Sequence, residues 1–171
     1  MSRVIALPDE EATRRLGALL ARHCPWQLPG ERSVFLSGEL GAGKTTLTAA
    51  LFAACGVRED VRSPSYALVE TYPFGERLGV HVDLYRLLDP AELEPLGLRD
   101  YLETNTLFVV EWPERGAGEL PVPDLWLHLA LAPSGRRCLL ESRTDAGGRW
   151  LAAADTDLLS QNTSEIVGVS S

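Results

Sequence analysis

The sequence predicts an α/β fold in which helices cover a mixed parallel and antiparallel sheet in three layers. An apolar run at residues 33–37 ends in a glycine-rich segment, and a segment rich in Ala, Leu and Thr follows at residues 44–55. This succession of strand, turn and helix patterns is typical of a sheet covered by helices. Farther along, two pairs of strand patterns are each separated by a short turn, and such hairpins add antiparallel strands.

The first third of the chain predicts a helix, a strand and a second helix. Apolar residues recur at helical spacing between Asp9, the expected N-cap, and Arg22. The run at 33–37 is short and apolar, as expected for a buried strand. The helix predicted at 44–55 ends at Gly56, a residue suited to the left-handed conformation of a C-cap.

The rest of the chain is richer in strand patterns. Residues 66–72 and 78–85 predict one hairpin, and residues 125–131 and 137–143 predict another. Between them, residues 106–111 form a continuous apolar run that ends in an acid, which indicates a strand buried on both faces.

Two short helical segments and a terminal tail complete the prediction. Asp89 followed by proline is a good helix start, and residues 98–102 predict one more helical turn. The polar, serine-rich stretch 155–171 is expected to be a mobile tail. We therefore expect a single domain over residues 1–154.

Composition narrows the possible functions. The chain has 171 residues and a formal net charge of −8, so tight and direct binding to a nucleic acid backbone is not expected. It has no apolar run long enough for a membrane span and no pattern of a secretory signal. Its three cysteines are scattered, which fits neither a disulfide framework nor a zinc site. These features favour a soluble protein of the reducing cytoplasm.

The segment Gly38-Glu-Leu-Gly-Ala-Gly-Lys-Thr45 matches the phosphate-binding pattern G-x-x-x-x-G-K-[ST] at every position. Its glycines allow backbone N–H groups to approach an anion, and the following helix adds its positive N-terminus. Lys44 would contact the β- and γ-phosphates, and the Thr45 hydroxyl would bind Mg²⁺. The pattern predicts a P-loop NTPase-like domain whose nucleotide-binding residues are Glu39, Leu40, Gly41, Ala42, Gly43, Lys44, Thr45 and Thr46.

A P-loop also needs a carboxylate near its metal ion. Asp83 lies in a strand pattern, and Glu111 follows the apolar run, where a buried strand would deliver it to the carboxyl edge of the sheet. Burial of such an acid is costly unless a metal or hydrogen bonds compensate. We expect both acids to bind Mg²⁺ or to activate the attacking water. Together with Lys44 they form the predicted catalytic set. A solvent-facing Glu111 and a structural Asp83 are the alternatives.

Four further residues are candidates with weaker support. His81 alternates with Asp83 on a strand, so it could orient the acid, contact phosphate or be structural. Ser65 lies in the polar loop where nucleotide switches place a hydroxyl, although a plain proline turn would look the same. Trp112 could pack over the site or belong to the core, and Arg86 is expected to be structural or to contact a partner.

Several blocks, in this order, resemble the bacterial TsaE family of tRNA threonylcarbamoyladenosine biosynthesis ATPases. The P-loop alone would not distinguish families, whereas the combination with the later blocks is specific. One departure is that the family usually has Ser-Pro-Thr where this chain has Ser-Pro-Ser. The blocks are Gly38-Glu-Leu-Gly-Ala-Gly-Lys-Thr-Thr46, Ser63-Pro-Ser-Tyr-Ala-Leu-Val-Glu70, His81-Val-Asp-Leu-Tyr-Arg-Leu87, Glu94-Pro-Leu-Gly-Leu-Arg-Asp-Tyr101 and Val110-Glu-Trp-Pro-Glu114.

The resemblance implies an ATPase, weak alone and stimulated by partners, that cycles the TsaD–TsaB complex. That complex transfers threonylcarbamoyl to an adenosine of tRNA, so tRNA would be met only through the complex. The resemblance also implies that the nucleotide is ATP and not GTP. It implies that Thr45 binds Mg²⁺, and that Asp83 and Glu111 bind Mg²⁺ and activate the attacking water. Ser65 would be the switch hydroxyl, and Trp112 would lie against the switch.

Two other functions are compatible with the P-loop itself. A small-molecule kinase would need an acceptor pocket and commonly an arginine-rich lid, and only Arg86 and Arg99 lie between Asp83 and Glu111. A nucleotide-sensing interaction module would bind ATP without hydrolysing it.

Overall fold

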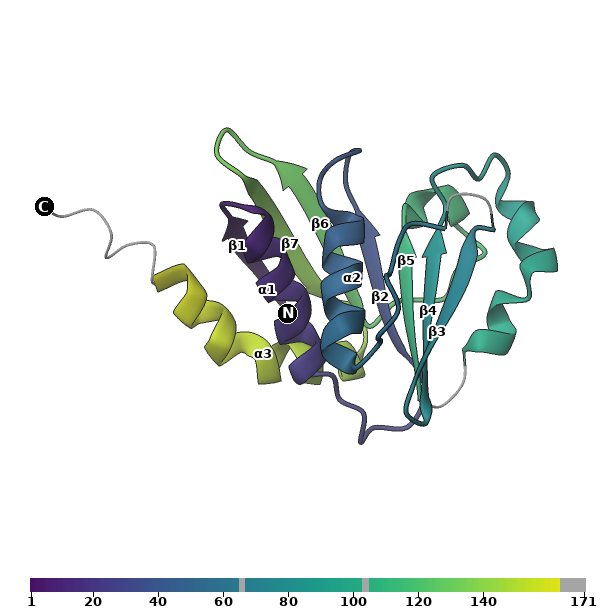
Figure 1. Ribbon diagram of the computed structural model, residues 1–171, viewed down its shortest axis with the longest axis horizontal. Coiled ribbons are helices and arrows are strands. Elements are labelled where there is room, and N and C mark those ends of the chain that lie inside the picture. Colours follow the sequence, from purple (N-terminus) through teal and green to yellow (C-terminus); the bar gives the residue numbers. More distant parts are fainter. Residues whose placement is uncertain (65–66, 103–104, 164–171) are drawn as a thin grey trace, which may run out of the picture.

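A computed structural model describes residues 1–64, 67–102 and 105–163, with side chains up to Leu158. In this part of the chain, one seven-stranded sheet has the order β1-β7-β6-β2-β5-β4-β3 (Figure 1). The central strands β6, β2, β5 and β4 are parallel, and the pairs β1–β7, β6–β7 and β3–β4 are antiparallel. The predicted α/β fold with a mixed sheet is thus confirmed. The strands are β1 (Ser2–Leu7), β2 (Arg32–Ser37), β3 (Val69–Phe74), β4 (Arg77–Asp83), β5 (Thr106–Glu111), β6 (Leu125–Leu131) and β7 (Arg136–Ser142).

Helices α1 (Glu10–Arg22) and α2 (Lys44–Cys55) lie side by side over one face of the sheet (Figure 1). Gly17 permits this close approach, because a Cβ at that position would lie 2.6 Å from the backbone oxygen of Leu47. None of the helices in the described residues combines the length and the apolar character that crossing a membrane requires. The remaining helices are α3 (Asp145–Thr163) and the 3₁₀ helices η1 (Pro90–Leu96), η2 (Leu98–Tyr101) and η3 (Pro113–Gly116).

Two apolar clusters form the core, one on each face of the sheet. The larger cluster joins α1, α2 and α3 to the sheet, with Leu16 and Leu47 fully buried between the two front helices. The smaller cluster packs the 3₁₀ elements, through Leu93 and Leu98, against Phe108 and its neighbours on the opposite face. Because β5 contributes to both clusters, it is buried on both faces, as its continuous apolar sequence predicts.

The predicted helix ends are confirmed, and both hairpins form, although the first one turns at residues 75–76 and not over 73–77. The Asp9 side chain accepts a hydrogen bond from the Ala12 backbone N–H at 2.7 Å and caps α1. Gly56 ends α2 in the left-handed region, with φ of 108°. Asp89 caps η1 in a capping box with Glu92.

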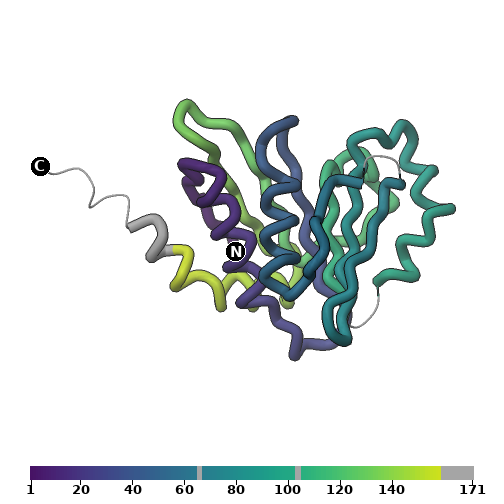
Figure 2. Tube along the Cα trace, in the orientation of Figure 1, coloured from purple at the N-terminus to yellow at the C-terminus, as the bar shows by residue number. Residues whose placement is uncertain are grey.

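Two elements were not predicted. Strand β1 pairs with β7 at the sheet edge, and α3 runs to Thr163, so the expectation of a tail beginning after Ala154 is wrong for residues 155–163. Figure 2 shows α3 beside the N-terminal elements. There the Arg3 guanidinium donates to Asp155 Oδ2 at 2.7 Å, and Leu158 is buried. These contacts hold α3 against the domain.

Candidate functional site

The glycine-rich loop 38–43 joins β2 to α2 at the point where the sheet order reverses. Strands β5 and β6 flank β2 on opposite sides and run parallel to it, so a crevice opens at the carboxyl end of β2. Gly38 has φ of 138°, and a Cβ there would lie 2.1 Å from the Leu129 carbonyl oxygen. The loop therefore has this path only with glycine at its first position.

Gly43 begins α2 in the left-handed region, with φ of 100°, and no side chain caps the helix. The first N–H groups of α2 thus point out of the helix end without a side-chain acceptor from the cap position. Together with the helix dipole, this arrangement favours an anion at the loop.

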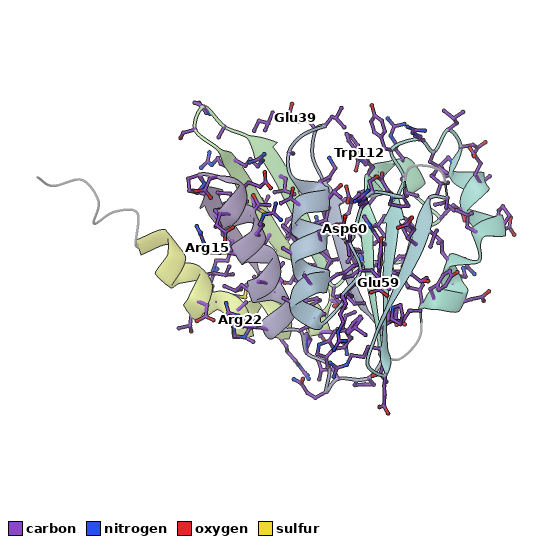
Figure 3. All side chains as sticks on the ribbon, in the orientation of Figure 1. Arg15, Arg22, Glu39, Glu59, Asp60 and Trp112 are labelled. Atoms are coloured by element: carbon purple, nitrogen blue, oxygen red, sulfur yellow. The ribbon has the colours of Figure 1, made fainter. Side chains whose placement is uncertain are left out.

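Lys44 is buried at the mouth of the loop. Its Nζ donates to the carbonyl oxygens of Gly38, at 2.6 Å, and Glu39, at 2.9 Å, and lies 3.9 Å from the centre of the Trp112 ring. Figure 3 shows Glu39 and Trp112 at the same end of the molecule. Burial lowers the pKa of the Lys44 ammonium, and nearby carboxylates, with Glu111 foremost, oppose that shift.

Glu111 ends β5 beneath the loop and is almost completely buried. Its Oε2 accepts the Thr45 hydroxyl at 3.0 Å, and its Oε1 lies 2.8 Å from His81 Nε2. The Thr48 hydroxyl lies 3.4 Å from the same Oε1. The predicted alternative of a solvent-facing acid is therefore wrong.

Asp83 ends the neighbouring strand β4 and is paired in register with Glu111. It accepts hydrogen bonds from the Ser63 hydroxyl and, at 2.9 Å, from the Tyr85 backbone N–H. Since Ser63 lies in the loop that follows α2, Asp83 connects that loop to the edge of the sheet where Glu111 lies. The switch candidate Ser65 lies outside the described residues.

Trp112 follows Glu111 with φ of 58° and directs its ring over Lys44 and beside Tyr85. Its backbone N–H donates to the Leu36 carbonyl at 3.1 Å, so the turn is tied to β2. The ring packs over the site and also against the smaller apolar cluster, so both interpretations of Trp112 hold in part.

These side chains line one pocket of about 300 Å³. The structure brings most of the predicted site residues to it, whereas Ala42 points into the core instead. Arg86 lines a small neighbouring pocket with Asp83 and Tyr85. The pocket is lined by Leu40, Gly41, Gly43, Lys44, Thr45, Thr46, Ser63, Asp83, Tyr85, Glu111, Trp112 and Arg136.

Arg136 was missed by the sequence analysis. It begins β7, and its Nε is buried with no hydrogen-bond partner among the described residues. Nη2 lies 3.5 Å from the Gly41 carbonyl oxygen, and Nε lies 3.3 Å from where a Cβ on Gly43 would be. Only the sheet order, which folds the β6–β7 hairpin beside the loop, reveals this neighbour.

The donor set suits a small hard cation shared with a ligand. In the described residues, no group of three or more His, Cys, Asp or Glu side chains could hold a metal by itself. The Thr45 hydroxyl and the carboxylates of Asp83 and Glu111 are oxygen donors, which Mg²⁺ prefers, and Mg²⁺ usually completes its shell with phosphate and water. These residues therefore fit a Mg²⁺ ion that arrives with a nucleotide.

The fold and the loop with its lysine, hydroxyl and strand-end acids define a protein of the P-loop NTPase fold class. A family model described as threonylcarbamoyl adenosine biosynthesis protein TsaE matches residues 7–138. The chain therefore belongs to the TsaE family.

Relatives from two different bacteria support this assignment. A tRNA threonylcarbamoyladenosine biosynthesis protein TsaE from Haemophilus influenzae is 39% identical over 86% of this chain and 94% of its own length. A protein of the same name from Streptomyces coelicolor is 40% identical, and the match covers 85% of this chain and 98% of that protein. The crystal structure of Bacillus subtilis YdiB superposes with a TM-score of 0.72 over 92% of this chain and 95% of YdiB at 22% identity, which supports the fold.

Proposed function

We propose that this chain is a Mg²⁺-dependent ATPase that acts in threonylcarbamoyladenosine modification of tRNA. One observation carries the proposal. The Thr45 hydroxyl donates a hydrogen bond of 3.0 Å to the Glu111 carboxylate, beside the buried Lys44. A P-loop hydroxyl and a strand-end carboxylate are the groups that P-loop proteins place at Mg²⁺, and the lysine serves the phosphates. The proposed role in tRNA modification comes from the names of the relatives.

Each residue has a role that follows from its position. The backbone N–H groups of the loop and of the start of α2 would hold the β-phosphate, and Lys44 would leave its two carbonyl partners for phosphate oxygens. Thr45, Glu111 and Asp83 would hold Mg²⁺ directly or through water. When bound, Mg²⁺ would neutralise the charge that develops on the phosphate oxygens during hydrolysis.

The partners are proposed from the family. With a net charge of −8, this chain is poorly suited to bind tRNA by itself. A role beside the TsaD and TsaB proteins, in which tRNA is met only through the complex, agrees with that charge. Weak hydrolysis by the isolated chain and stimulation by these partners are expected.

The surroundings of the site favour hydrolysis over transfer to a small acceptor. A kinase would commonly need an arginine-rich lid over an acceptor pocket, and Arg136 is a single arginine at this pocket. Arg99 instead lines a separate cavity of about 330 Å³ with the acids Glu94 and Asp100. Water is therefore the proposed phosphoryl acceptor.

Phosphate release from ATP, measured with and without the TsaD–TsaB pair and tRNA, tests the proposal. We expect slow release by the chain alone and faster release with the pair. Absence of release under both conditions would contradict the ATPase and leave a nucleotide-sensing module, whereas phosphate appearing on a small molecule would indicate a kinase.

A substitution of Lys44, with a matched control, tests the proposed phosphate site directly. Lys44→Ala removes the charged donor and should weaken ATP binding roughly 10- to 100-fold or more in calorimetry. Arg99→Ala, in the separate cavity, is the matched control and should bind as the wild type does. Equal affinity of the Lys44→Ala variant and the wild type would refute the proposed phosphate site.

A further inference from the structure

His81 lies one strand in from the β3 edge of the sheet and has no exposure to solvent. It belongs to β4, in register with Glu70 of β3 and Val109 of β5. Its ring and the Phe52 ring of α2 are nearly perpendicular, with centroids 6.3 Å apart and planes at 87°. The imidazole is therefore enclosed between the sheet and α2.

The imidazole has one hydrogen-bond partner among the described residues. Nε2 lies 2.8 Å from Glu111 Oε1, and Nδ1 is buried without a partner in the part of the chain that the structure describes. Because a carboxylate oxygen only accepts, a hydrogen bond in this pair needs a proton on Nε2. A buried polar atom without a partner is costly, so packing alone would favour an apolar side chain here.

The bond fixes how Glu111 presents its second oxygen. His81, from β4, holds Oε1, while the Thr45 hydroxyl, from α2, reaches Oε2 at 3.0 Å. Without His81 the carboxylate would keep, among the described residues, hydrogen bonds from two hydroxyls of α2, of which the one from Thr48 is 3.4 Å long. It could then turn about its terminal torsion, which is broad and weakly restrained for glutamate.

We propose that His81 is a positioning residue, whose Nε2–H holds the Glu111 carboxylate in the orientation that pairs with Thr45 and receives Mg²⁺. The proposal rests on the proposed function, because it assigns Glu111 to the metal. Groups that orient metal-facing ligands typically change metal affinity or activity about 10- to 100-fold when they are removed.

Two amides of different length provide a matched test. The amide nitrogen of glutamine in His81→Gln can reach the place of Nε2, whereas that of asparagine in His81→Asn reaches only the place of Nδ1. Affinity for ADP is measured by calorimetry with MgCl₂ and with EDTA, and the ratio of the two affinities gives the gain due to Mg²⁺. The turnover of ATP is measured beside it.

We expect His81→Asn to lose about 10-fold or more of the Mg²⁺ gain and of kcat, and His81→Gln to retain most of both. Affinity in EDTA should stay within about 3-fold of the wild type in both variants, which a general disturbance of the core would not allow. An Mg²⁺ gain in His81→Asn equal to that of the wild type would overturn the positioning role alone. A wild-type protein with no Mg²⁺ gain would overturn the metal site and this role together.

A second measurement serves if His81→Asn does not fold. The ¹⁵N signals of the imidazole, assigned among the three histidines by their loss in His81→Gln, report the tautomer in the wild-type protein. We expect the proton on Nε2 and a shift of that signal when Mg²⁺ is added to the ADP complex. A proton on Nδ1, or a signal that Mg²⁺ leaves unchanged, would contradict the inference.

Discussion

The ammonium nitrogen of Lys44 lies 3.9 Å from the centre of the Trp112 ring, within the range of a cation–π contact. The same nitrogen is held by two carbonyl oxygens of the glycine loop. A phosphate group is a stronger partner for an ammonium than carbonyls and a ring, because it carries full charge. Binding of a nucleotide should therefore move the ammonium group of Lys44 away from the Trp112 ring.

Intrinsic fluorescence tests this expectation. The addition of ADP with Mg²⁺ should change the emission of the wild-type protein, because the charge beside the Trp112 indole moves. The change should vanish in Trp112→Phe and persist in Trp26→Phe, whose ring packs against Phe74 outside the pocket. An unchanged response in Trp112→Phe would mean that another tryptophan reports binding.

Glu111→Gln should separate binding from hydrolysis. The substitution keeps the size of the side chain but removes the charge that Thr45 and His81 hold in place. We expect kcat to fall roughly 10- to 100-fold, while ATP affinity in EDTA changes less than about 3-fold. Glu119→Gln, which changes an exposed acid outside this pocket, is the control. Turnover at the wild-type level would assign Glu111 to structure.

Arg136 should act on the nucleotide from the side opposite to the acids. It enters the pocket from β7, across β2 from the strands that carry Asp83 and Glu111. We expect Arg136→Ala to weaken the binding of ADP and of ATP equally, by roughly 10- to 150-fold, because a charged hydrogen bond is lost away from the terminal phosphate. Arg137→Ala, which changes the next residue on the other face of the strand, is the control. A loss confined to ATP would place Arg136 at the γ-phosphate instead.

The docking of α3 can be measured as stability. Leu158→Ala should lower the free energy of unfolding by about 2–4 kcal/mol, because it opens a cavity in the larger core cluster. Thr156→Ala changes an exposed residue of the same helix and should stay within about 0.5 kcal/mol. Equal effects in urea unfolding would show that α3 does not depend on this contact.

The P-loop and the acids could be predicted because their chemistry is local in sequence. The glycine pattern, the lysine and the hydroxyl are consecutive, and Glu111 follows a run whose burial its composition already indicates. The pairing of Asp83 with Glu111 also follows once two parallel strands end at the same edge. These parts of the site need no knowledge of distant contacts.

Other parts depend on tertiary contacts that leave little trace in the sequence. Strand β1 buries only Ile5 and Leu7 while Val4 remains exposed, so its apolar pattern is weak. Near its start, α3 contains two glycines, which disfavour a helix. A Cβ on Gly147 would lie 1.9 Å from the Asp124 carbonyl oxygen, so packing against the sheet requires that glycine.

The left-handed backbone of Trp112 has a consequence for how this protein can change. A residue with a side chain in that region costs roughly 1–2 kcal/mol relative to a right-handed one, and glycine would remove the cost. The substitution that relaxes the chain here also deletes the ring above Lys44. Selection for thermal tolerance alone would therefore favour the replacement of Trp112 by glycine. An engineered, more stable variant that is altered at residue 112 should be tested for loss of nucleotide affinity.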